Sequence, residues 1–125
     1  KDNPLYYIQY AHARICSVLR KAEADSEKLN KSDLELLDSD REVEIQKMLR
    51  QYPDLIKRAA LSSEPHLICY YLRDLASSFH SYYNSEKFLI DDKNLMRSRL
   101  FLLCGVKQVV HNGLSILGID APEEM

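Results

Sequence analysis

The sequence predicts an all-α protein, a bundle of about five helices, and three observations lead to this fold class. Apolar residues recur at steps of three and four along most of the 125-residue chain, which is the spacing of one helix face. No stretch alternates convincingly between apolar and polar residues, as a half-buried strand would. Three glycines and four prolines are too few for an all-β chain of short strands and turns. The length suits one domain over residues 1–125.

The first helix is expected to begin at Asn3-Pro4 and to run to about Ala24. Asparagine can cap free amide groups at a helix start, and proline in the first turn has no amide hydrogen to leave unpaired. Its face is defined by apolar spacing over Leu5, Ile8, His12, Ile15, Val18, Leu19 and Ala22. The polar, aperiodic residues 25–37 predict a loop or a short helical piece with low order.

A second helix is predicted to start at Ser39 or Asp40 and to end at Pro53, because acids occupy its first turn and proline breaks helices. A short third helix follows over residues 54–61. Residues 63–65, Ser-Glu-Pro, predict the start of a fourth helix that runs to about Tyr83.

Residues 84–93 break the periodicity and are expected to form a loop. The last helix then spans about residues 94–117, and Gly118 is a natural C-cap because glycine tolerates the left-handed conformation.

The charge pattern excludes a polybasic nucleic-acid binder, because the net charge is −2. The charge is uneven, with nine acidic and three basic residues between Glu23 and Glu44. The rest of the chain therefore carries a net charge of +4. Folding could present a mildly basic face opposite an acidic arm, or simply a solvated surface without a partner.

No catalytic or metal-binding motif is present. The four histidines and three cysteines form no C-x-x-C, H-x-x-x-H or H-E-x-x-H pattern, and no glycine-rich phosphate cradle occurs. Each cysteine has apolar neighbours, which predicts inert thiols in a reduced, cytoplasmic protein. No apolar run approaches the ~20 residues of a membrane helix, so no membrane partner is expected.

Tyrosine is unusually frequent, with eight residues and no tryptophan. Exposed tyrosines interleaved with arginines could stack single-stranded bases. Alternatively, they could pack the bundle and direct their hydroxyl groups to its rim. The tyrosines that cluster along the chain are Tyr6, Tyr7, Tyr10, Tyr70, Tyr71, Tyr82 and Tyr83.

Residues 3–14 read N-P-L-Y-Y-I-Q-Y-A-H-A-R and resemble the first helix of the DALR-type anticodon-binding domain of arginyl-tRNA synthetases. The family pattern, N-P-x-Y-Y-x-Q-Y-A-H-A-R, is long and nearly without gaps. The resemblance continues through P-H at 65–66, Y-Y-L at 70–72, F-H at 79–80 and Y-Y-N at 82–84, then N-G-L at 112–114 and the tail A-P-E-E-M. It covers essentially the whole chain, and the acidic segment is its least diagnostic part.

This resemblance implies a helical domain, of the type found in class I synthetases, that binds the anticodon stem-loop of arginine tRNA. The parent enzyme would be an arginine-tRNA ligase whose separate catalytic domain uses ATP. Signatures similar to H-I-G-H and K-M-S-K-S are absent from this chain, so no catalytic residue or cofactor is expected in it. The chain starts at Lys1 without methionine, and we expect a C-terminal piece of a longer, monomeric protein.

The same resemblance nominates the residues of an anticodon pocket: Tyr7, Ala11, Tyr83 and Met125, with Arg14 and Asn84 as neighbours. Positions 7 and 11 lie one turn apart, so a small residue at 11 would leave room beside an aromatic ring for a flipped base. Met125 could fold over that base with a soft thioether. Candidates for phosphate contacts are Arg14, Arg20, Arg97 and Lys107.

Two other functions remain open at this point. One is a helical protein-interaction module without RNA binding, in which Tyr6, Tyr7 and Tyr83 would be buried by a partner. The other is the equivalent domain of a different class I synthetase, such as the cysteine enzyme. The tyrosine-rich first helix favours the arginine enzyme.

Overall fold

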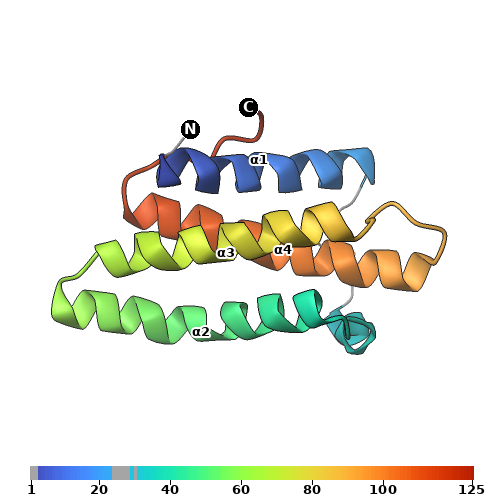
Figure 1. Cartoon of the computed structure of the whole chain (residues 1–125), viewed down its shortest axis with the longest axis horizontal. Coiled ribbons are helices and arrows are strands. Elements are labelled where there is room, and N and C mark those ends of the chain that lie inside the picture. The colour runs from blue at the N-terminus through green and yellow to red at the C-terminus, as the bar shows by residue number, and fades with distance from the viewer. Residues whose placement is uncertain (1–2, 24–28, 30) are drawn as a thin grey trace.

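A computed structural model describes residues 3–23, 29 and 31–125 and is all-helical over these residues (Figure 1). Within these described residues, four α-helices and one short 3-10 helix follow one another. They are α1 (Pro4–Lys21), η2 (Lys31–Leu36), α2 (Asp40–Ser62), α3 (His66–Ser85) and α4 (Lys93–Ile116). The all-α bundle is confirmed, and the number of α-helices is one lower than predicted. None of the described helices is both long enough and apolar enough to cross a membrane.

The count differs because the helix boundary predicted at Pro53 does not exist, and Pro53 lies inside α2. The prediction that proline ends this helix is wrong, and the expected third helix is the second half of α2. Pro53 is exposed, whereas Tyr52 and Leu55 on either side of it are buried. Packing of both halves on the bundle therefore outweighs the local cost of proline, about 3 kcal/mol in a helix interior. The hydroxyl of Tyr71 donates to the carbonyl oxygen of Met48, close to the proline (2.6 Å).

The first helix begins as predicted. The Asn3 side chain accepts a hydrogen bond from the Leu5 amide (2.9 Å), and Pro4 occupies the first turn. The helix ends at Lys21, three residues earlier than expected. A short helical piece is present at η2. Residue 24, the predicted end of the first helix, and residues 25–28 and 30 of the predicted loop lie outside the described residues.

The starts of the later helices agree only in part with the sequence. Ser39 caps α2 in a reciprocal pair with Glu42, as the acidic first turn suggested. Ser63 does not cap α3; it ends α2 in the left-handed conformation (φ 56°), and α3 has no side-chain cap. Asp92 caps α4, which begins one residue before its predicted start. Gly118 follows α4 with φ +75°.

A buried polar network joins three helices at one end of the bundle. The Glu42 carboxylate on α2, only 1% exposed, accepts hydrogen bonds from the Tyr82 hydroxyl (2.7 Å) and from Arg99 Nε (2.8 Å). Arg99 on α4 also pairs with Glu86, just after α3 (3.0 Å). Burial alone would raise the pKa of Glu42, but hydrogen bonds from Tyr82, Arg99 and Ser39 together hold that pKa below its usual value.

Candidate nucleic-acid interface

One side of α1 carries Tyr7, Tyr10 and Arg14, because steps of three and four residues return to the same face of a helix. Helices α1 and α3 lie beside one another in the bundle (Figure 1). This side of α1 faces His80 and Tyr83 of α3. These five residues form what we call the α1/α3 cluster.

Arg14 lies between two aromatic rings of the cluster. Its guanidinium carbon is 4.2 Å from the centroid of the Tyr83 ring and 4.8 Å from that of Tyr10. Both distances are within the range of favourable cation–π contacts. The cluster therefore combines a fixed positive charge with aromatic faces, which is the chemistry that binds unpaired nucleotides.

His80 forms the buried floor of the cluster. The centroid of its ring is 4.7 Å from that of Tyr7 and 5.6 Å from that of Tyr10, and its Nδ1 lies 3.2 Å from Nη1 of Arg14. Burial lowers the pKa of His80, and the nearby Arg14 charge lowers it further. The imidazole is therefore neutral near pH 7.

The outer edge of the cluster is open to solvent. Tyr10 is 36% exposed and Tyr6 is 49% exposed, and their two rings are stacked with centroids 6.5 Å apart. A base can reach these rings without any rearrangement of the bundle. The predicted site residues did not include Tyr6, Tyr10 or His80. The i, i+4, i+8 spacing of Tyr6, Tyr10 and Arg14 could have indicated both tyrosines.

Three of the six predicted site residues, Tyr7, Arg14 and Tyr83, come together in the cluster. Ala11 is fully buried and has no surface open to a base. Asn84 is exposed in the last turn of α3, and Met125 is half-exposed in the tail. Within the described residues, no hydrogen bond or ring contact joins these last two to the cluster.

The C-terminal tail runs beside α1 (Figure 1) and is held through its backbone. Gln9 donates to the carbonyl oxygen of Asp120 (2.9 Å), and Arg20 donates to that of Glu123 (3.3 Å). Between them, His12 Nδ1 donates to the carbonyl oxygen of Pro122 (2.8 Å). These side chains project from a different face of α1 than the cluster does, so the tail leaves the cluster uncovered.

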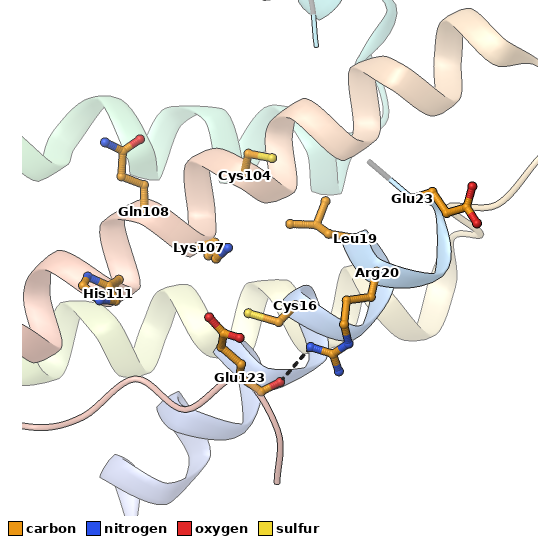
Figure 2. Close-up of a pocket in the computed structure, with 9 residues that line it drawn as sticks. All are labelled: Cys16, Leu19, Arg20, Glu23, Cys104, Lys107, Gln108, His111 and Glu123. Carbon is orange, nitrogen blue, oxygen red and sulfur yellow. Dashed lines mark hydrogen bonds between the residues drawn. The ribbon is translucent and has the colours of Figure 1, made fainter. Parts of the chain in front are cut away.

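A cavity of about 520 Å³ lies between α1, α4 and the tail (Figure 2). It is lined by Cys16, Leu19, Arg20, Glu23, Cys104, Lys107, Gln108, His111 and Glu123. Its two Lys/Arg side chains, Arg20 and Lys107, are matched by two acids, so the lining does not favour an RNA backbone. Burial raises the pKa of both thiols, which are therefore neutral and unreactive near pH 7.

The remaining candidate phosphate contacts lie apart from the cluster. Arg20 and Lys107 line the cavity, and Arg97 is on α4, where it donates to Asn94. Arg14 is thus the one predicted phosphate contact that lies within the cluster. In the described part of the chain, no group of three histidine, cysteine or acidic side chains is placed to hold a metal ion.

The buried histidines predict a stability that falls on acidification. Burial lowers the pKa of His12, and Lys107 lowers it further. Its Nε2 is buried without a partner among the described residues, so protonation would leave an unpaired N–H. The pKa values of His12 and His80 are lowered only in the folded protein. The neutral side chains therefore contribute to the stability of the fold above pH 6.5, and this contribution is lost as the pH falls below that value.

Chemical denaturation between pH 7.5 and 5.5 is expected to show a decrease of up to about 1.4 kcal/mol per pH unit for each histidine. His12→Asn, which can still donate to the Pro122 carbonyl, should reduce this slope. A stability that is constant over the range would contradict the prediction.

An open cluster of aromatic rings and a cation on a helical bundle is the kind of surface on which unpaired bases can stack. The chain belongs to the DALR anticodon-binding domain family, whose model matches residues 8–125. It is 49% identical over 99% of its length to an arginine–tRNA ligase of Coxiella burnetii and 51% identical, over the same share, to that of Thioalkalivibrio sulfidiphilus. The chain spans 22% of each of these relatives.

A solved structure of an arginyl-tRNA synthetase also matches this chain. The arginyl-tRNA synthetase of Thermus thermophilus superimposes with a TM-score of 0.83 and 32% identity. The match covers 95% of this chain and 21% of the Thermus chain. The four-helix bundle is therefore the fold of one part of that enzyme.

Proposed function

We propose that this domain binds the anticodon stem-loop of an arginine tRNA as part of a longer arginine–tRNA ligase. The observation that carries this proposal is the α1/α3 cluster, in which Arg14 lies against the rings of Tyr10 and Tyr83. Family membership supports anticodon binding as the task. The names of the relatives support arginine as the amino acid.

The cluster can hold a loop nucleotide by two contacts. The exposed rings of Tyr6 and Tyr10 offer a stacking surface, worth about 1–3 kcal/mol per base. Arg14 can pair with the adjacent phosphate or stack on the base. All arginine codons have G at the middle position, so the middle anticodon base is always C and is the natural base to be read here.

The rest of the ligase supplies the reaction. In this proposal a class I catalytic domain of the same polypeptide activates arginine with ATP and transfers it to the tRNA, and the whole protein acts as a cytoplasmic monomer. The domain described here holds the anticodon end of the same tRNA. Because the net charge is −2, binding by this domain alone is expected to be weak and salt-sensitive.

Fluorescence anisotropy with two labelled stem-loops tests the proposal. One carries an arginine anticodon, and its control has the middle C replaced by U. We expect tighter binding of the arginine loop at low salt. Equal weak binding of both loops would reduce the role of this domain to backbone contacts, and binding of neither would favour the protein-interaction module.

The tail provides a separate prediction. We propose that the thioether of Met125 folds over the bound base, although this residue is half-exposed without RNA. Deleting residues 123–125 removes Met125 and the Arg20 contact to Glu123, so we expect at least about fivefold weaker binding of the arginine loop, equivalent to one hydrogen bond. Met125→Ala separates the side chain from the backbone contact. Unchanged affinity of both variants would remove Met125 from the site.

A further inference from the structure

His80 contacts Arg14 and is itself shielded from solvent. Its side chain is buried, with 7% of the residue exposed, below the rings of Tyr7 and Tyr10. Nδ1 lies 3.2 Å from Nη1 of Arg14, while Nε2 lies 3.4 Å from the carbonyl oxygen of Tyr7. One imidazole thus contacts both the backbone of α1 and the cation of the cluster.

These two contacts require a single neutral tautomer. A guanidinium only donates hydrogen bonds, so Nδ1 must carry a lone pair to accept from Arg14. Nε2 then bears the hydrogen and donates to the Tyr7 carbonyl. The other neutral tautomer, with its hydrogen on Nδ1, does not fit either contact. Its Nδ1–H would face a guanidinium that only donates, and its Nε2 lone pair would face a carbonyl oxygen that only accepts.

We propose that His80 is a positioning residue for RNA binding, whose Nδ1 holds the Arg14 guanidinium against the faces of Tyr10 and Tyr83. The inference rests on the proposed binding of an anticodon loop by this cluster. An arginine that is ordered before the RNA arrives loses less side-chain freedom on binding, which raises affinity. Arg14 is held by one hydrogen bond and two ring faces in this structure.

The same geometry makes the site sensitive to pH. A proton on Nδ1 would place an N–H against the guanidinium, so two positive charges would meet and Arg14 would be released. The titratable or charged groups that face His80 among the described contacts are Arg14, Tyr7 and Tyr10, all on α1. RNA affinity should therefore fall on acidification, although added positive charge alone would raise it.

Two variants of His80 separate the hydrogen bond from the packing. His80→Phe keeps a ring but has no acceptor, whereas His80→Asn keeps an acceptor near Nδ1 and does not titrate. At pH 7.5 we expect about tenfold weaker binding of the arginine stem-loop by His80→Phe, the fold-change of one lost hydrogen bond to a charged group. His80→Asn should stay within about threefold of the wild type.

The pH profile and a double variant decide whether His80 acts through Arg14. As the pH falls below 6.5 and His80 takes up a proton, the wild type should lose affinity and His80→Asn should not. In an Arg14→Gln background, His80→Phe should have no further effect. Equal losses in both backgrounds, or the same pH profile for wild type and His80→Asn, would overturn the proposal.

A measurement without RNA distinguishes failure of this inference from failure of the proposed function. In NMR spectra, ring currents of Tyr10 and Tyr83 should shift the Arg14 side-chain protons upfield. His80→Phe should move these resonances towards random-coil positions, and His80→Asn should retain them. If the shifts behave in this way but no stem-loop binds, the positioning of Arg14 stands and the RNA-binding function is wrong. Unshifted Arg14 resonances in the wild type would overturn the positioning itself.

Discussion

Replacing Glu42 by alanine is expected to lower the free energy of unfolding by about 3–5 kcal/mol, the usual loss when one member of a buried ion pair is removed. The change leaves Arg99, of whose side chain only 11% is exposed, without its buried partner, and it removes the acceptor of the Tyr82 hydroxyl. Thermal unfolding followed by circular dichroism should show a midpoint lower by on the order of 10–20 °C.

Glu44→Ala is the matched control, because Glu44 is an exposed acid two positions further along α2. It should change stability by less than about 0.5 kcal/mol. Since the hydrogen bonds lower the pKa of Glu42, its contribution is present above pH 4.5 and is lost as the pH falls below that value. Equal stabilities of the two variants at pH 7 would show that the network contributes nothing.

Replacing Tyr83 by alanine is expected to weaken binding of the arginine stem-loop by about 2- to 30-fold, which corresponds to the loss of the cation–π contact that holds Arg14. Arg14 would lose the ring that lies 4.2 Å from its guanidinium, and the cluster would lose an aromatic face. Anisotropy titrations at low salt measure the change. Tyr83 is only partly buried, so circular dichroism should show a folded domain.

Tyr70→Ala provides a matched control on the same helix. Tyr70 is an exposed tyrosine that, like Tyr83, has an arginine over its ring, since the Arg73 guanidinium carbon lies 5.3 Å from the ring centroid. It lies outside the α1/α3 cluster. Its replacement should leave the affinity within about twofold of the wild type. If Tyr83→Ala unfolds the domain, Tyr83 is a core residue and its assignment to the site fails.

The sequence was sufficient for the fold class and for most helix starts, because these depend on local chemistry. The Asn3-Pro4 start and the Ser39 start each follow from residues within one helical turn. Pro53 was misjudged for the opposite reason. Whether a helix continues through proline depends on how both of its halves pack on other helices, which local residues do not reveal.

The site was only partly predictable for a similar reason. Tyr7, Arg14 and Tyr83 follow from the family resemblance, and the structure brings them together. Ala11 follows from the same resemblance, yet its side chain is fully buried in the core. The role of His80 depends on its contacts with α1, 66 residues away from Arg14 in the chain, and no local pattern indicates them.

The most direct test of the central claim is a titration of the labelled domain with the arginine stem-loop, followed by amide chemical shifts in NMR spectra. We expect the largest changes at Tyr7, Tyr10, Arg14 and Tyr83, with smaller changes along the tail. Residues lining the α1/α4 cavity from α4, such as Lys107 and Gln108, should change little. Largest changes at those residues or along α2, with none at the cluster, would contradict the proposed interface.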